Sequence, residues 1–220
     1  MASTRVPTLL FALLALLATL FTAAAADDKA DWKFVTRSGD VDIYQRPRAG
    51  TNLREYKGIG LIDASPAVAK RVLEDVNEYP HFMPYVVEAK LISNDGRTRV
   101  SYQRISPPMA SDRDYTVCVH CETRTHAQGT AYFNHWTAAN DLGPAEKSGV
   151  TRVKLTQGSW LLEPAKGGTQ TNATYTIFTD SGGNLPALLL NTAGKTAVPK
   201  VFAALRSQSK LPKYSREPRE

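Results

Sequence analysis

The chain has few of the residues that build metal centres or disulfide frameworks, with two cysteines and four histidines. The histidines, from His81 to His135, do not show the ligand spacing of a zinc site. Cys118 and Cys121 lie in an expected strand, where three residues span about 10 Å and place the side chains on opposite faces. A disulfide tolerates about 7 Å between Cα atoms. We therefore expect two free thiols, no metal site and no cofactor.

The sequence also lacks the short motifs of common catalytic chemistry. It has no His-Glu-x-x-His, no Gly-x-Ser-x-Gly and no phosphate-binding loop. The segment from Gly58 to Asp63 resembles a dinucleotide fingerprint, but Asp63 stands where the third glycine is needed. We interpret Gly58 and Gly60 as close backbone approaches within a strand, and we assign no catalytic residue.

Strong charge of one sign is missing as well, since the formal net charge is only +6. No helix or stripe concentrates the basic residues, so we do not expect nucleic acid as a partner. The densest basic stretch is the C-terminal end, and we expect residues 211–220 to be a flexible, solvated tail. Weak attraction of this tail to anionic lipid headgroups is the alternative.

Only one long apolar run is present, and it lies at the N-terminus. Residues 9–21 follow Arg5 and precede the small residues 24–26 and the charged Asp27. This order is typical of a cleavable signal peptide, and the run is shorter than the about 20 residues that span a membrane. We expect residues 1–26 to be removed, residues 27–210 to form one domain, and the protein to be periplasmic or secreted.

The rest of the chain has the pattern of an α+β domain. After a short helix at 31–35, hydrophobic alternation predicts strands and hairpins, and Ser65-Pro66 marks the start of a helix. A long amphipathic helix closes the chain and is expected on the concave face of the sheet, leaving a cavity. The strands are expected at 41–46, 54–62, 86–93, 98–105, 114–125, 129–138, 150–156 continuing to 160–162, and 169–180.

Alternation along these strands also predicts which side chains face the cavity, because successive residues point to opposite sides of a sheet. The sequence alone does not separate cavity wall from solid core at these positions. The expected ligand-binding set is Val100, Tyr102, Tyr115, Val117, Val119, Phe133, His135, Val153, Leu155, Tyr175 and Ile177, with Leu189 from the closing helix.

Several segments, taken in order, resemble the StAR-related lipid-transfer (START) family of the helix-grip superfamily. The resemblance implies a curved antiparallel β-sheet wrapped around a long C-terminal helix, with an internal hydrophobic cavity that binds and transfers a lipid. Val119 stands where some sterol-binding members have a cavity arginine, so recognition through that arginine is not expected. The segments are 41–44, 64–66 with 73–75, Ser-Asp-Arg-Asp-Tyr at 111–115, 158–164, and Asp-Ser-Gly-Gly-Asn-Leu-Pro at 180–186.

The resemblance also implies a cavity mouth formed by two loops, whose apolar residues insert into the membrane. We interpret Arg113 and Asp114 as an ion pair or cap that fixes the loop before the central strand, with headgroup contact as the alternative. The expected gate residues are Pro107, Pro108, Met109, Gly182, Gly183, Leu185 and Pro186.

The expected function is reversible binding and transfer of a membrane lipid by a non-enzymatic monomer that touches membranes transiently. Two alternatives remain open within the same superfamily. One is a polyketide cyclase or aromatase, which needs a general base deep in the pocket, and His135 or a tyrosine is the nearest candidate. The other is a quinone-binding chaperone.

Overall fold

The computed structural model describes residues 31–183 and 187–215, without the side chains of residues 187–191 and 193. The expected signal peptide at 1–26, the gate residues Leu185 and Pro186, and the Leu189 side chain lie outside the described residues. Among the described helices, none is both long enough and apolar enough to cross a membrane.

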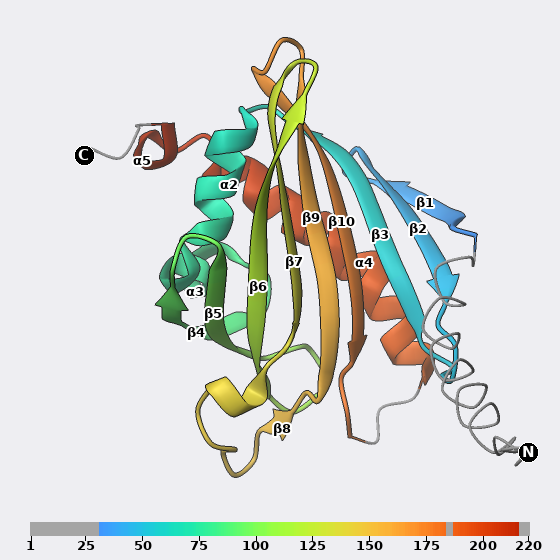
Figure 1. Cartoon of the computed structure of the whole chain (residues 1–220). Helices are drawn as coiled ribbons and strands as arrows, with labels where there is room; N and C mark the ends of the chain where they lie inside the picture. Colours follow the sequence, from blue (N-terminus) through green and yellow to red (C-terminus); the bar gives the residue numbers. More distant parts are fainter. Residues whose placement is uncertain (1–30, 184–186, 216–220) are drawn as a thin grey trace, which may run out of the picture.

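A ten-stranded curved sheet dominates the described part of the chain (Figure 1). The strand order is β1-β2-β3-β10-β9-β7-β6-β5-β4, with antiparallel neighbours, and β8 pairs with β6 in parallel. The bounds are β1 (Lys33–Ser38), β2 (Val41–Pro47), β3 (Arg54–Ile62), β4 (Val86–Asn94), β5 (Thr98–Ile105), β6 (Arg113–His126), β7 (Gly129–Ala138), β8 (Thr151–Arg152), β9 (Leu155–Ala165) and β10 (Gln170–Asp180).

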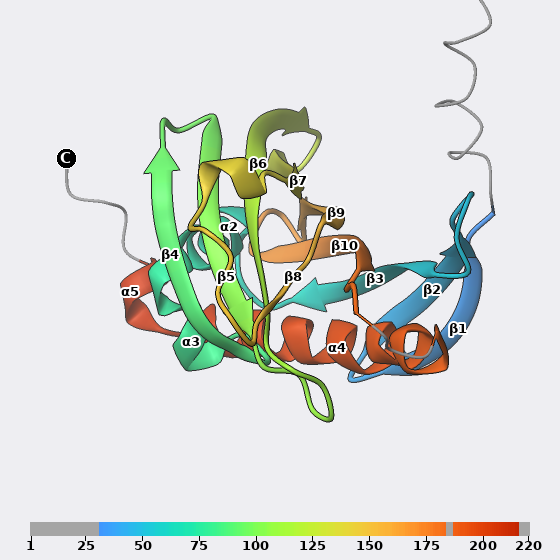
Figure 2. The same cartoon turned by 90° about the horizontal axis from the view of Figure 1, so that it is seen from below.

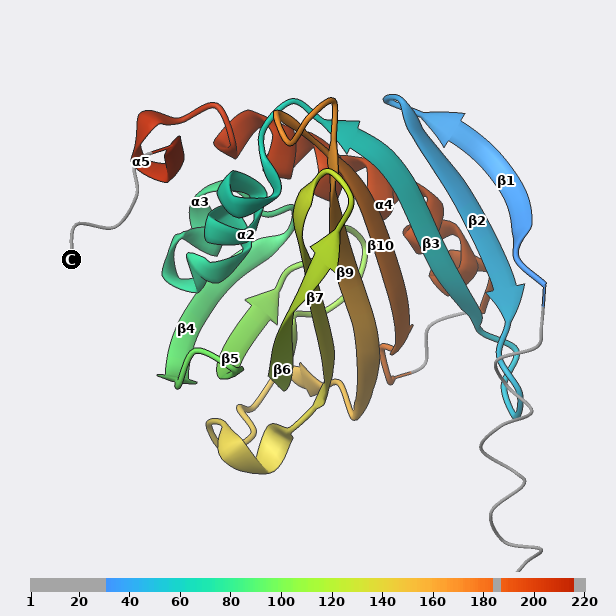
Figure 3. The same ribbon diagram turned by 45° about the horizontal axis from the view of Figure 1, so that its top comes forward.

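The long helix α4 (Ala187–Gln208) lies along the concave side of this sheet, which curves around it in Figure 2. The short elements α2 (Pro66–Glu74), η2 (Val76–Glu78) and α3 (Tyr79–Phe82) lie at the β4–β5 end of the sheet (Figure 3). Helix α2 packs on β7, β9, β10 and α4, whereas η2 and α3 pack on β4. The α+β helix-grip fold is confirmed.

Helix α4 packs directly on β3 because two glycines leave no side chain between them. A Cβ atom on Gly58 would lie 2.5 Å from Val198 Cγ1, and one on Gly60 would lie 3.1 Å from the Phe202 ring. Val198, Phe202 and Leu205 are fully buried at this contact. The interpretation of these glycines as close backbone approaches is therefore confirmed.

The start of α2 follows the sequence signal. The Ser65 hydroxyl accepts a hydrogen bond from the backbone N–H of Val68 at 3.4 Å, and Pro66 takes the first helical turn. Such a cap satisfies a backbone donor that the helix itself leaves unpaired. The buried face of α2 is formed by Ala69, Val72 and Leu73, so the helix is fixed by its sheet-facing side.

The expected short helix at 31–35 is wrong, because this segment leads into strand β1, which pairs with β2. Trp32 is held from the neighbouring strands: Arg46 Cζ lies 4.7 Å from its ring centroid and Lys57 Nζ lies 4.4 Å from it. These cation–π contacts favour the extended chain. Tertiary contacts have overridden the local helical pattern.

The expected continuous strand at 150–162 is interrupted. Its first part, β8, pairs in parallel with the start of β6, and the chain then passes Val153 before β9 begins. The backbone N–H of Val153 donates to the carbonyl of Asp114 at 2.9 Å. This bond ties the crossing segment to β6.

The expectation of a flexible tail is wrong for residues 212–215. Residues Pro212–Ser215 form the short helix α5, and Tyr214 is buried against α2. The Tyr214 hydroxyl donates to Asp75 Oδ2 at 2.9 Å, and Arg71 Nε donates to the Tyr214 carbonyl at 2.6 Å. Residues 216–220 lie outside the described residues.

Candidate functional site

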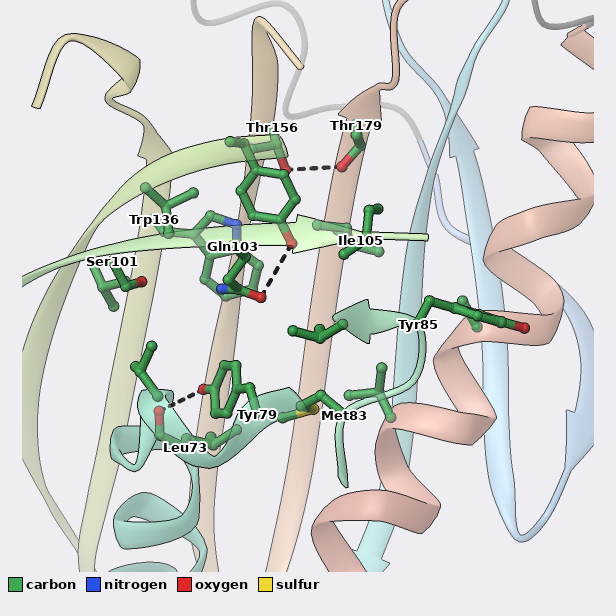
Figure 4. A pocket seen from close by; sticks show the side chains of 18 of the residues that line it. Leu73, Tyr79, Met83, Tyr85, Ser101, Gln103, Ile105, Trp136, Thr156 and Thr179 are labelled. Carbon is green, nitrogen blue, oxygen red and sulfur yellow. Dashed lines mark hydrogen bonds between the residues drawn. The ribbon is translucent and has the colours of Figure 1, made fainter. Parts of the chain in front are cut away.

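A cavity of about 260 Å³ lies between the sheet, α4 and the α2–α3 segment (Figure 4). The α2–α3 segment contributes Leu73, Val76, Tyr79 and Met83 to its wall, and α4 contributes Ala197 and Val201. Most of the remaining wall comes from β5, β6, β7, β9 and β10. The cavity therefore lies on the concave face of the sheet, between α4 and the α2–α3 segment.

Six of the expected ligand-binding residues line this cavity. Tyr115, Val117 and Val119 follow one another on the same face of β6, as strand alternation requires. The other three come from elsewhere in the sheet and are Val153, Tyr175 and Ile177. Direct contact of these side chains with a ligand stays a prediction.

The expectation is wrong for five residues, which do not line the cavity. On β5, Ser101 and Gln103 lie opposite Val117 and Tyr115, so the odd-numbered residues face inward. A shift of one residue moves every side chain to the other face of a strand. The five residues outside the cavity wall are Val100 and Tyr102 on β5, Phe133 and His135 on β7, and Leu155 on β9.

Hydrophobicity misled the prediction because the convex face of β5 is covered too. Tyr102 is buried there, its hydroxyl donates to Asp114 at 3.2 Å, and Lys147 Nζ lies 5.3 Å from its ring centroid. Leu155 is 45% exposed, and the rings of Phe133 and His135 stack outside the cavity at 5.4 Å. An apolar side chain on this sheet therefore does not by itself indicate that the residue faces the cavity.

Polar residues on the inward-facing register were missed. Val119 of β6 pairs with Arg99 of β5 on one side and with Trp136 of β7 on the other. Paired residues point to the same side of a sheet, so all three side chains face the concave side. Once Val119 is placed on the concave face, the pairing register of β5 with β6 identifies Arg99 as its inward-facing partner. On β5, β7 and β9, the lining residues that the prediction did not include are Arg99, Ser101, Gln103, Ile105, Asn134, Trp136, Thr156 and Trp160.

Several polar groups of the cavity wall are paired and neutral. Thr156 and Thr179 share a hydrogen bond of 2.9 Å, and the Tyr79 hydroxyl donates to the Leu73 carbonyl at 2.6 Å (Figure 4). Burial raises the pKa of Tyr79 and of Tyr115 to about 12. Burial also raises the pKa of Tyr175 far above its usual range. These phenols stay protonated at neutral pH, so they donate hydrogen bonds rather than accept protons.

Comparison with known proteins identifies the family of this chain. A family model described as "Polyketide cyclase / dehydrase and lipid transport" matches residues 62–206. Human phosphatidylcholine transfer protein is 30% identical over 77% of this chain and 79% of its own length. The chain belongs to the START family.

Two bacterial proteins are similar as well. An uncharacterized protein of Pseudomonas aeruginosa is 31% identical over 87% of this chain and 93% of its own length. The solved structure of a StAR-related lipid transfer protein from Xanthomonas axonopodis superposes with a TM-score of 0.73 at 25% identity. That match covers 82% of this chain and 99% of the other.

The Arg-Asp motif of this START domain has a structural role, although the two residues do not pair with each other. Asp114 is fully buried and accepts from Arg152 Nε at 2.7 Å and from Arg152 Nη2 at 3.2 Å. Arg113 donates instead to the carbonyl of Ser111 in the preceding loop. Neither residue of the motif lines the cavity, so the alternative of headgroup contact has no geometric support.

The two loops that are expected to form the gate lie next to each other. Gly182 and Gly183 have φ values of 63° and 70°. Residues other than glycine rarely adopt this backbone conformation. A Cβ atom on Gly182 would lie 3.5 Å from Thr151 Cγ2, and Ser111 Oγ lies 3.4 Å from Thr151 Oγ1. Thr151 therefore bridges the loops. Met109, at the tip of the loop containing Pro107 and Pro108, is 91% exposed.

The cysteines and histidines of the START domain form no metal site. Cys118 and Cys121 are both free thiols, as strand geometry predicts, and burial raises the pKa of the Cys121 thiol. The rings of His120 and His135 lie 5.2 Å apart outside the cavity. Within residues 31–183 and 187–215, no three His, Cys, Asp or Glu side chains are placed to hold a metal ion.

Proposed function

We propose that this protein binds a membrane lipid in its cavity and carries it between membranes without catalysing a reaction. The observation that carries the proposal is the cavity itself, which is lined mainly by apolar and aromatic side chains and by phenols that burial keeps neutral. Similarity to phosphatidylcholine transfer protein and to a StAR-related lipid transfer protein supports it.

The driving force is transfer of apolar surface out of water. Each methylene group that enters the cavity contributes about 0.8 kcal/mol. An apolar cavity of about 150 Å³ encloses a benzene molecule, and this cavity is less than twice as large. A lipid with two acyl chains therefore requires the walls to move apart, whereas part of a single chain fits without movement.

The cyclase alternative is weakened because His135, its candidate general base, does not line the cavity. A general base for this chemistry needs a pKa near neutrality and a place in the pocket. His135 lies outside the cavity wall, and burial strongly raises the pKa of Tyr79, Tyr115 and Tyr175 in that wall. The quinone-binding alternative uses the same hydrophobic wall and is distinguished by identifying the bound molecule.

We also propose where the protein works. The N-terminal apolar run and the small residues that follow it support export to the periplasm or the medium after cleavage near residue 26. The exposed Met109 supports transient contact with a membrane surface, and we propose that the protein makes this contact as a monomer. N-terminal sequencing of the protein from a cell fraction tests the export, and a mature chain that begins at Met1 would contradict it.

The function is tested by transfer of fluorescent phosphatidylcholine between donor and acceptor vesicles. The wild-type protein is expected to accelerate transfer well above the spontaneous rate. Val119→Trp fills the cavity and should abolish the acceleration. His120→Trp adds the same side chain to the exposed face of the same strand and serves as the matched control.

Two results would contradict the proposal. One is a wild-type protein that neither accelerates transfer nor yields any lipid or quinone on solvent extraction and mass spectrometry. The other is equal transfer by Val119→Trp and by His120→Trp, which would mean that the ligand does not occupy this cavity.

A further inference from the structure

Two buried polar side chains in the cavity wall have hydrogen-bonding atoms without a partner among the described residues. Arg99 is 4% exposed, and its Nε and Nη1 atoms make no hydrogen bond. Asn134 is 3% exposed, and its Oδ1 atom makes none. More than nine in ten buried polar groups in proteins are paired, so two such residues in one cavity point to a ligand.

The two side chains lie toward the same end of the cavity, where α2 meets the sheet. Arg99 on β5 pairs with Val119 of β6, and Asn134 on β7 pairs with Cys121 two residues further along β6. The side chains of Arg99 and Asn134 therefore both face the concave side, from the two strands that flank β6. Glu74, the last residue of α2, lies 3.6 Å from Arg99 Nη1. We call this region the α2 end of the cavity.

The charge of Arg99 is only loosely compensated. Glu74 is already held by Lys70, whose Nζ lies 2.7 Å from Glu74 Oε1 and 2.8 Å from Oε2. At 3.6 Å from the guanidinium, Glu74 makes no hydrogen bond to it. Arg99 thus presents a charged donor group in a site largely removed from water. A guanidinium in such a place matches the oxygens of a carboxylate or a phosphate.

Arg99 is the only charged side chain among the described residues that line the cavity. Ile105, Ile177 and Val201 line the cavity elsewhere, and hydrocarbon is their best partner. Asn134 complements Arg99, because its unpaired Oδ1 accepts a hydrogen bond from a hydroxyl group of a ligand whose oxyanion Arg99 holds. The wall therefore distinguishes the two ends of an amphipathic molecule.

We propose that Arg99 anchors the oxyanion, carboxylate or phosphate, of the lipid bound in this cavity, beside Asn134 and with the hydrocarbon directed away from α2. This inference rests on the proposed lipid binding and goes beyond it, because it fixes the class of headgroup and the orientation of the ligand. A lipid without an acidic group lacks this anchor.

The test compares lipids with and without the oxyanion. A long-chain fatty acid is paired with the alcohol of the same chain, and phosphatidylcholine with diacylglycerol of the same chains. Arg99→Met keeps the length of the side chain and removes the charge. We expect it to weaken binding of the fatty acid, the phosphatidylcholine or both by roughly 10- to 100-fold, and to leave binding of the alcohol and diacylglycerol unchanged.

The two pairs distinguish the sources of the oxyanion, since selective loss in the fatty-acid pair indicates a carboxylate and selective loss in the phospholipid pair indicates a phosphate. Arg97→Met is the matched control, because Arg97 is exposed in the adjacent hairpin. Asn134→Asp provides a second variant, since its carboxylate repels an oxyanion and should cause the same selective loss. Thermal melts confirm that each variant is folded before binding is measured.

The inference is overturned if both folded variants bind the acidic and neutral lipids as the wild-type does, or lose both classes equally. It is also overturned if the wild-type prefers the alcohol and diacylglycerol, which would leave lipid binding itself intact. A wild-type protein that binds none of the four probes would instead contradict the proposed function.

Discussion

The two halves of the space under the sheet are filled in opposite ways. Under β2 and β3, α4 lies against the strands, and a Cβ atom on Gly58 would overlap Val198. Under β5, β6 and β7, the facing elements leave a cavity of about 260 Å³. The same sheet therefore carries a solid core at one side and an open pocket at the other.

The difference is set by the size of the side chains on the concave face. Glycines in β3 let the helix approach, whereas Trp136, Trp160 and Tyr175 occupy the corresponding face of β7, β9 and β10. Trp160 lies at the border: its ring is 5.3 Å from Phe202 in the solid core, and it also lines the cavity. Small residues bring elements together, and bulky ones hold them apart around a space.

The largest loss of stability is expected where a buried ion pair fixes the open half. Asp114→Asn leaves Arg152 without its charge partner in a buried site and should lower the free energy of unfolding by about 3–5 kcal/mol. Glu122→Gln breaks an exposed pair with Arg124 and should cost less than about 1 kcal/mol. Urea denaturation measures both, and equal effects would show that Asp114 does not support the fold.

A smaller loss is expected when bulk enters the solid half. Gly58→Val places methyl groups where Val198 and Phe202 already lie, and such overpacking costs roughly 1–3 kcal/mol. Ile59→Val changes the exposed face of the same strand and should remain within about 0.5 kcal/mol of the wild-type. A shift of the urea midpoint for Gly58→Val no larger than that of the control would mean that α4 can move away at little cost.

Bulk that enters the open half should be tolerated. Val119→Trp extends into the cavity and should change the free energy of unfolding by less than about 1 kcal/mol, well below the effect of Gly58→Val. Chemical denaturation of both variants under the same conditions gives the comparison. If Val119→Trp unfolds as readily as Gly58→Val, the two halves do not differ and Val119 belongs to a solid core.

The smallest structural effect is expected at the rim of the open half. Met109→Asp should leave the melting temperature unchanged, because the side chain is 91% exposed. If this loop enters the membrane interface, the added charge should weaken vesicle binding and slow lipid transfer several-fold. Sedimentation with vesicles measures the binding, with Met109→Leu as the control that keeps the apolar side chain. Wild-type transfer by Met109→Asp would remove the loop from the mechanism.

Much of the fold could be predicted from the sequence because its local signals agree. The strands at 54–62, 98–105 and 129–138 begin and end where alternation and turn residues indicate. Ser65 and Pro66 similarly mark the start of α2. The expectation failed where distant contacts decide, as at Trp32, which is held by cations from β2 and β3.

The cavity wall could be predicted only in part. On β6 the apolar residues and the inward register coincide, so Tyr115, Val117 and Val119 were found. On β5 they do not coincide, because Tyr102 is buried on the convex face while Arg99 faces the cavity. A search for apolar residues selects the wrong face of such a strand, and only the pairing register corrects it.

The central claim is that the open half holds a lipid, and native mass spectrometry of the purified wild-type protein tests it most directly. The account predicts a population heavier than the polypeptide by the mass of one lipid, which gas-phase activation releases. In Val119→Trp this population should be lost, whereas His120→Trp should retain it. A wild-type protein that carries no added mass, even after incubation with vesicles, would contradict the claim.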